Sequence, residues 1–136
     1  MEIIRGGSQA PVKGPDEYFT GNVTIAWQFS RTDPARLAGA LVSFEAGART
    51  AWHSHPLGQT LIVTSGVGWT QCEGEPRQEI RAGDIIWCPP EHRHWHRATA
   101  TSPMSHIALQ EALDGKVVAW MQKVTDEEYL AVQPAE

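Results

Sequence analysis

The chain has 136 residues, enough for one domain with a single hydrophobic core. Its 11 Lys and Arg stand against 16 Asp and Glu, so the net charge is −5 and no basic block indicates a nucleic-acid partner. No apolar run approaches the roughly 20 residues of a membrane span, and residues 1–10 lack the apolar core of a signal peptide. We therefore expect a cytoplasmic protein with no nucleic-acid or membrane partner.

The first twenty residues are rich in Gly and Pro and predict an irregular arm, which covers a sheet edge or crosses to a partner subunit. Short segments rich in Val, Ile, Thr and Trp follow, and they are typical of β-strands. In chain order, we expect strands at residues 22–29, 38–44, 50–55, 60–64, 69–72, 84–88, 95–98, 105–110 and 116–121. Many short strands at close spacing predict an all-β sandwich or barrel.

The end of the chain carries the clearest helix signal. Thr125 and Glu128 have the spacing of a capping box, in which each side chain accepts a hydrogen bond from the other residue's backbone N–H. A short C-terminal helix over residues 126–131 should follow. The chain shows no tandem repeat and no low-complexity linker, so residues 1–136 are expected to form one domain.

Five of the six histidines lie in two tight clusters. His53 and His55 are two residues apart, so on a strand both imidazoles point to the same face. A turn at residues 56–58 could bring the Gln59 oxygen beside them. The second cluster is "HRHWH", where His94 and His96 again alternate and His92 is expected on the surface. Imidazole and amide ligands suit divalent Mn, Fe, Co, Ni or Zn; the alternative is a set of ordinary polar residues on an exposed strand.

The spacing of these residues resembles the two sequence motifs of the cupins, over roughly residues 38–110. In the first motif Gln59 stands in the position of the usual Glu; in the second, Glu91 replaces the usual Gly and Ala98 the usual Asn. With these three departures included, the motif positions are Gly47, His53, His55, Gln59 and Gly66, then Gly83, Pro89, Glu91, His94 and Ala98. The resemblance implies a small jelly-roll-like barrel (a double-stranded β-helix), with motifs at residues 47–66 and 83–98 and metal ligands His53, His55, Gln59 and His94.

A narrower resemblance runs nearly end to end. The segments "GARTAWHSHPLGQTLIVTSGVGW", "HRHWH" and "LDGKVVAWMQKVTDEEY" are similar to the bacterial cupin hydroxynitrile lyases. Those are manganese-dependent enzymes that cleave, or in reverse form, (R)-cyanohydrins such as mandelonitrile. The resemblance implies a Mn²⁺ cofactor, with Fe²⁺, Co²⁺, Ni²⁺ or Zn²⁺ as alternatives, and a cyanohydrin, or an aldehyde plus cyanide, as substrate. A homodimer or homotetramer is expected, as is common among small cupins.

Two other functions stay open, an iron-dependent cupin dioxygenase and a non-catalytic cupin that binds a metal or small molecule. The neutral Gln59 favours the lyase. Four neutral ligands leave the +2 charge of the ion uncompensated, which makes it a stronger Lewis acid. Cyanohydrin cleavage needs such an acid, because the hydroxyl must become an alkoxide and cyanide must leave as an anion.

Cleavage also needs a base. On the strand at residues 105–110, His106, Ala108 and Gln110 share one face while Ile107 and Leu109 share the other, and the period-2 pattern does not say which face is buried. The resemblance implies that His106 lines the cavity as general base, with an unperturbed pKa of about 6.5 near working pH. His96 is a second candidate for proton handling, or alternatively a residue at the cavity rim.

The substrate pocket should be small and apolar. Ala40 and Val42 share a face of the strand at residues 38–44, and the resemblance implies that they shape the substrate cavity. Plain barrel core is the alternative for both. Gln110 could hydrogen-bond the substrate or the cyanide nitrogen.

Overall fold

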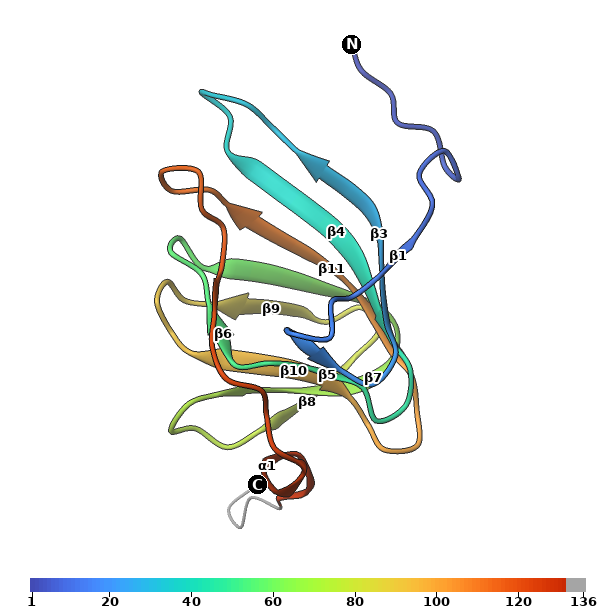
Figure 1. Cartoon of the computed structure of the whole chain (residues 1–136), viewed down its shortest axis with the longest axis vertical. Helices are drawn as coiled ribbons and strands as arrows, with labels where there is room; N and C mark the ends of the chain where they lie inside the picture. Colours follow the sequence, from blue (N-terminus) through green and yellow to red (C-terminus); the bar gives the residue numbers. More distant parts are fainter. Residues whose placement is uncertain (132–136) are drawn as a thin grey trace.

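The computed structural model describes residues 1–131, which form twelve β-strands and one short α-helix. The strands make one sheet that curls into a half-open barrel, with the helix at one end (Figure 1). The strands are β1 (Val12–Lys13), β2 (Phe19–Thr20), β3 (Val23–Ser30), β4 (Leu37–Phe44), β5 (Arg49–Thr50), β6 (His53–Ser54), β7 (Gln59–Cys72), β8 (Gln78–Arg81), β9 (Ile85–Cys88), β10 (His94–Ala98), β11 (Met104–Glu111) and β12 (Ala119–Trp120), and the helix is α1 (Asp126–Leu130). The predicted all-β architecture with an irregular arm and a short C-terminal helix is confirmed.

Strand β7 belongs to both walls of the barrel. Its first half pairs with β11 and β9, in the wall whose order continues β11-β4-β3-β1, and its second half pairs with β10 and β8. The prediction of separate strands at residues 60–64 and 69–72 was wrong. Gly66 adopts a φ of 78°, which lets the strand bend between the walls without ending, since glycine carries no Cβ.

The predicted strand at residues 50–55 is instead two short strands, β5 and β6. Between them Ala51 and Trp52 leave the ladder, because their N–H groups donate to other segments, to Tyr18 O (2.7 Å) and Gln122 O (3.0 Å). His53 and His55 still point to one side, with ring centroids 5.0 Å apart. The predicted common face of the two imidazoles is therefore confirmed.

The arm and the tail each add short strands. β1 pairs with β3 and so covers the edge of the first wall, as expected of the arm. Sequence reasoning missed β1, β2 and β8, whose few residues show no periodic pattern. The predicted strand at residues 116–121 shrinks to β12, because only Ala119 and Trp120 pair with β6.

The capping box is confirmed. Thr125 Oγ1 accepts from the Glu128 N–H (3.1 Å), and Glu128 Oε1 accepts from the Thr125 N–H (3.0 Å). The helix ends at Leu130, one residue earlier than predicted, with Ala131 as its cap. Among residues 1–131, no helix is long and apolar enough to cross a membrane.

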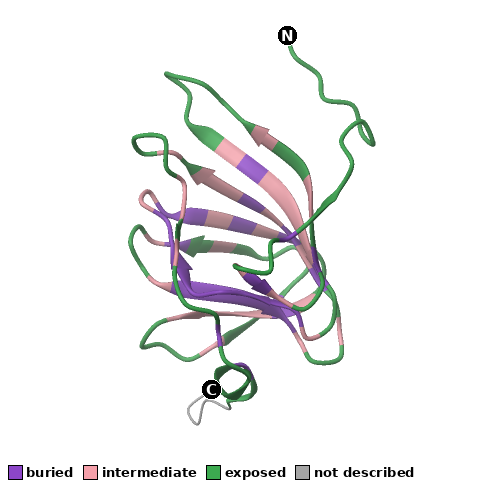
Figure 2. Ribbon diagram, viewed as in Figure 1, coloured by how far each residue is buried: buried purple, intermediate pink, exposed green. Residues whose placement is uncertain are grey.

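The core lies between the two walls, where buried residues concentrate on the middle strands (Figure 2). On β11, His106 and Ala108 point into the barrel and are buried, while Ile107 and Leu109 on the other face stay partly exposed. The structure thus settles which face of this strand points inward. The main apolar cluster is Phe19, Val23, Phe44, Ala48, Val63, Ile80, Ala98 and Met104.

Candidate metal centre and active site

Five histidines and Gln59 converge in the barrel, and all six side chains are buried. They come from β6 (His53), the following turn (His55), the start of β7 (Gln59), β10 (His94 and His96) and β11 (His106). His53 lies opposite His94 in the β6–β10 pair, with ring centroids 4.4 Å apart. The turn that returns Gln59 to the histidines is closed by a hydrogen bond from the Gly58 N–H to His55 O (3.2 Å). Exposed His92 lies outside this group, as predicted.

Three of these imidazoles are held in the same way. The Nδ1 atoms of His53, His55 and His94 donate to the carbonyls of Ala51 (2.9 Å), Val117 (2.7 Å) and His92 (2.9 Å), respectively. A carbonyl can only accept, so the proton of each neutral ring is on Nδ1 and the lone pair is on Nε2. Metal-binding histidines are typically oriented in this way.

The electrostatics of these rings favour the neutral form that a metal requires. Burial, followed by the neighbouring His94 and His55, lowers the pKa of His53 well below its ordinary value. Burial also lowers the pKa of His94 to about 4. Within residues 1–131, the Nε2 atoms of His55 and His94 are buried without a hydrogen-bond partner. These orphaned lone pairs fit a divalent cation, which would satisfy them.

His96 also lies close to His53 and His94. Ligand atoms of these three residues lie within 4.8 Å of one another, in the one cluster of the described residues with metal-site spacing. Unlike the other rings, His96 has both nitrogens occupied. Nδ1 lies 3.1 Å from Thr70 Oγ1, and the Nε2–H donates to Gln59 Oε1 (3.1 Å). This side chain is therefore a rival ligand, already engaged in a polar chain.

That polar chain orients Gln59. The Gln59 amide nitrogen donates to Gln110 Oε1 (3.0 Å), and the Gln110 amide nitrogen donates to Ala38 O (3.3 Å). Because the Ala38 carbonyl only accepts, both amides are fixed in direction and the Gln59 oxygen faces His96. That oxygen keeps a second lone pair for a metal. The expected contact of Gln110 with a substrate has to compete with these two bonds.

His106 lies beside this group with no polar partner. It is 2 % exposed, and neither ring nitrogen has a hydrogen-bond partner in the described part of the chain. Its ring centroid lies 5.3 Å from that of Phe44 and 5.5 Å from that of His96. Burial lowers the pKa of His106 to about 4, so the expectation of a value near 6.5 was wrong. At neutral pH this imidazole is therefore uncharged, and both of its nitrogens are without a hydrogen-bond partner among the described residues.

The histidines open onto an apolar cavity of about 160 Å³. Ala40 and Val42 line it from one face of β4, and Gln110 lines it from β11, which brings the expected pocket residues together. None of the described residues that line it carries a carboxylate. Its apolar walls are Phe19, Ile25, Phe44, Ala108, Val118 and Trp120.

Sequence reasoning missed the contribution of the arm and tail to this site. Val117 supplies the carbonyl that holds His55, and Trp120 packs 4.8 Å from the His53 ring and stacks on Tyr18 at 4.6 Å. Alternation on the predicted strand at residues 116–121 puts Val118 and Trp120 on one face, but no local signal says that this face meets the histidines.

The second motif departs from the cupin pattern at Glu91, yet its turn is present. Glu91 adopts a φ of 64°, the left-handed conformation that favours glycine. Its N–H donates to His55 O (2.9 Å), which ties the turn before β10 to the first motif. Replacement of the usual Gly therefore leaves His94 in the site.

The barrel and its histidine cluster define a class of protein, the small metal-binding β-barrels with two histidine motifs. Residues 40–109 match the model of the cupin domain. The chain belongs to the cupin family.

The chain is also similar to individual known proteins. The chain is 60 % identical over 129 residues, 95 % of its length and 98 % of the relative's, to a protein of Granulicella tundricola named (R)-mandelonitrile lyase. A cupin-like protein of Thermotoga maritima superposes with a TM-score of 0.83 at 36 % identity, with both chains fully covered. A predicted oxalate decarboxylase from the same organism shares the fold alone, with a TM-score of 0.70 at 19 % identity over 82 % of this chain and all of the other.

Proposed function

We propose that this protein is a metal-dependent hydroxynitrile lyase that cleaves and forms (R)-cyanohydrins such as mandelonitrile. The observation that carries the proposal is the arrangement of His106. A neutral histidine without a polar partner lies beside a cluster of neutral metal-ligating groups, inside an apolar cavity lined by no described carboxylate. The relative named (R)-mandelonitrile lyase, 60 % identical over nearly the whole chain, supports it.

The proposed ligands are His53, His55, Gln59 and His94, and the proposed ion is Mn²⁺. The shared Nδ1 hydrogen bonds of the three histidines support this set, because they leave Nε2 as the donor atom in each ring. Fe²⁺, Co²⁺, Ni²⁺ and Zn²⁺ also accept imidazole and amide oxygen. When bound, such a cation would act as a Lewis acid and would stabilise negative charge that develops on the substrate.

The chain's own residues then transfer the proton and accommodate the substituent of the cyanohydrin. His106 takes the hydroxyl proton of the cyanohydrin while the carbon–cyanide bond breaks, its electron pair leaves with cyanide, and the carbonyl of the aldehyde forms. His106 then returns the proton to cyanide, so hydrogen cyanide is released and the histidine is neutral again. His96 is the second candidate for this transfer. Ala40 and Val42 leave space for the substituent of the cyanohydrin, and the apolar walls exclude water from it.

The test is release of benzaldehyde from mandelonitrile, measured under argon alongside elemental analysis of the purified protein. We expect turnover that follows bound metal and gives or consumes the (R) enantiomer. Turnover without oxygen rules against the iron-dependent dioxygenase, for which oxygen uptake by iron-loaded protein is the positive test. Tight ligand retention without turnover across a panel of cyanohydrins would favour the non-catalytic binding cupin and overturn the proposal.

We further propose that residues 1–136 form a single cupin domain and that the protein acts in the cytoplasm as a homodimer or homotetramer. The family match over residues 40–109 and the full-length match to the Thermotoga maritima cupin-like protein support the single domain. The location and the assembly are predictions from the sequence, tested by fractionation of cells and by sedimentation.

A further inference from the structure

One side chain that bonds to the histidine cluster lies outside the cavity. Thr70, on β7, lines a separate groove of about 310 Å³ and does not line the cavity of the histidines. Its hydroxyl nevertheless reaches the centre, because Thr70 Oγ1 lies 3.1 Å from His96 Nδ1. The other nitrogen of that ring, Nε2, lies 3.1 Å from Gln59 Oε1. Thr70 is thus two hydrogen bonds away from an oxygen that we propose as a metal ligand.

One arrangement of protons satisfies every group in this chain of hydrogen bonds. The amides of Gln59 and Gln110 both donate away from His96, so Gln59 Oε1 is left as an acceptor. His96 must therefore donate from Nε2, and its neutral ring keeps a lone pair on Nδ1. Thr70 satisfies that lone pair by donating its hydroxyl proton. In the reverse arrangement, Nε2 without a proton would face the Gln59 oxygen, and the Thr70 proton would have the more distant Trp95 O, at 3.4 Å.

The backbone of His96 is held independently of the Thr70 hydroxyl. Its N–H donates to Thr50 Oγ1 (3.2 Å), and the residue lies directly opposite Thr70 in the ladder between β10 and β7. Loss of the Thr70 hydroxyl would therefore leave the strand in place and act on the imidazole alone.

We infer that Thr70 is a positioning residue of the metal centre: through His96, its hydroxyl holds the Gln59 oxygen in a fixed direction and keeps His96 out of the ligand set. With its proton on Nε2, His96 offers a cation no lone pair there, although its ligand atom lies within 4.8 Å of those of His53 and His94. The choice between Gln59 and His96 as ligand is thus made by the position of a proton. This inference rests on the ligand set of the proposed lyase and is independent of the reaction.

The test separates the hydroxyl of Thr70 from its shape. Thr70→Val keeps the shape and loses the hydroxyl, whereas Thr70→Ser keeps the hydroxyl and loses a methyl group. Metal affinity, measured by competition with a chelator, should fall at least about tenfold in Thr70→Val, the usual range for groups that orient a metal ligand, and stay within about threefold of the wild type in Thr70→Ser. The absorption spectrum of the Co²⁺-loaded protein should change in Thr70→Val and match the wild type in Thr70→Ser.

A second measurement reads the proton position directly. Nitrogen NMR of the metal-free protein with labelled histidine should show the His96 proton on Nε2 in the wild type. Thr70→Asp should move it to Nδ1, because a carboxylate only accepts. The Nε2 lone pair of His96 then becomes available, and the Co²⁺ spectrum should show an additional nitrogen ligand.

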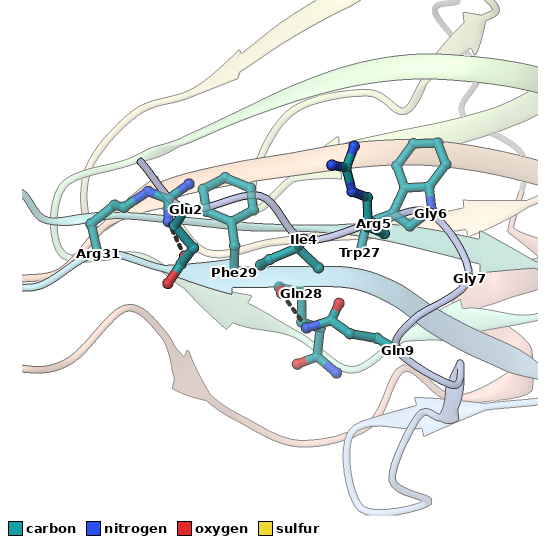
Figure 3. A pocket seen from close by; sticks show the side chains of 10 residues that line it. All are labelled: Glu2, Ile4, Arg5, Gly6, Gly7, Gln9, Trp27, Gln28, Phe29 and Arg31. Carbon is teal, nitrogen blue, oxygen red and sulfur yellow. Dashed lines mark hydrogen bonds and ion pairs between the residues drawn. The ribbon is translucent and has the colours of Figure 1, made fainter.

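Two control variants remove a hydrogen bond elsewhere. Thr64→Val is the matched control, because Thr64 also lies on β7 and its hydroxyl donates to Ser105 O (3.1 Å) on the exposed side of the strand. Gln9→Leu removes the bond from Gln9 to Gln28 O (3.2 Å) in the pocket under the N-terminal arm (Figure 3). Among the described residues, that pocket shares none with the cavity or the groove. Both variants should bind metal as the wild type does.

Unchanged metal affinity and an unchanged Co²⁺ spectrum in Thr70→Val would overturn the inference. An equal loss of affinity in Thr70→Ser would also overturn it, because the effect would then come from packing. Should Thr70→Val fail to fold, the wild-type NMR spectrum decides, since a His96 proton on Nδ1 contradicts the arrangement. Failure of the proposed function is distinguishable: a wild type that does not turn over mandelonitrile overturns the lyase and leaves the metal and NMR results standing.

Discussion

The candidate site depends on the protonation of single rings. His53, His55 and His94 each donate Nδ1–H to a backbone carbonyl, while His96 donates Nε2–H to Gln59 and His106 bonds to no other described residue. One residue type thus appears in three settings, which correspond to three proposed roles. The setting of His106 is the one that a general base requires, because its lone pair is not already used in a hydrogen bond.

Replacing His106 by Ala should leave bound metal near the wild-type level and lower turnover of mandelonitrile at least about 100-fold, the lower range for loss of a general base. Metal content is measured by elemental analysis and turnover by release of benzaldehyde. His92→Ala is the matched control, since that histidine is exposed and outside the site. Full activity in the His106 variant would assign the proton transfer elsewhere, with His96 as the next residue to test.

Gln59→Glu tests whether the neutral ligand set matters. A carboxylate lowers the net charge of the centre by one, so metal should bind as tightly or more tightly while turnover falls about tenfold, or 1.4 kcal/mol in the barrier. Metal affinity is measured by competition with a chelator and turnover by the same assay as above. A faster enzyme would contradict the charge argument. Loss of metal would instead show that the amide chain through Gln110 is needed for the geometry.

At the scale of elements, the tail from Val117 to the end of α1 closes the site and is held by two arginines of the barrel, Arg49 and Arg97. Arg49 on β5 is buried and donates from Nε (3.2 Å) and Nη2 (3.0 Å) to Val124 O, and its guanidinium lies 4.7 Å from the Tyr129 ring. Arg97 donates to Tyr129 O (2.7 Å). These bonds fix the tail whose Val117 carbonyl orients His55.

Arg49→Leu should therefore destabilise the fold by about 2–3 kcal/mol, because it removes charged hydrogen bonds to a buried carbonyl. It should also weaken metal binding several-fold through the loosened tail. Urea unfolding and chelator competition measure the two effects. Asp126→Asn is the control. Its side chain, 88 % exposed, bonds the same guanidinium at 2.6 Å, and the side-chain oxygen of Asn can still accept that hydrogen bond, so this change should cost less than Arg49→Leu. Equal effects of the two variants would refute the role of the buried anchor.

The element scale also shows where local pattern misleads. The run "TSGVG" around Gly66 has the composition of a turn, but β7 continues through it, since it finds β11 on one side and β10 on the other. Conversely, the run from Thr50 to His55 has strand composition but breaks at Ala51, since Tyr18 and Gln122 take its neighbouring N–H groups. Strand boundaries here depend on which other segments pair with the strand, and the strand's own sequence does not specify those partners.

At the scale of the whole molecule, the barrel keeps five imidazoles neutral away from water. Burial is the largest cause of the lowered pKa of all five, which reaches about 4 for His94 and His106. In the unfolded chain each titrates near 6.5. Below that pH the unfolded chain binds protons that the folded chain excludes. The free energy of unfolding is therefore highest above about pH 6.5 and decreases as the pH falls toward 4.

The metal-free protein should accordingly lose stability between pH 7.5 and pH 5.5. Each such histidine contributes up to about 1.4 kcal/mol per pH unit below its unfolded pKa. Urea unfolding at several pH values measures the slope. His106→Leu should lower the number of protons taken up on unfolding, which sets that slope, by about one. The substitution His92→Leu, at an exposed histidine, should leave the slope unchanged. A free energy of unfolding that stays constant down to pH 5.5 would contradict the buried neutral cluster.

The sequence by itself determined what depends on near neighbours. Two-residue spacing placed His53 with His55 and His94 with His96 on common faces, and the hydrogen bonds of the capping box at Thr125 close within three residues. The tertiary structure alone decided which face of β11 meets the cavity, since both faces are apolar enough to be buried. It also brought the Val117 carbonyl to His55, 62 residues away, and Thr70 to His96. Such contacts depend on the path of the chain through the barrel, which no local pattern records.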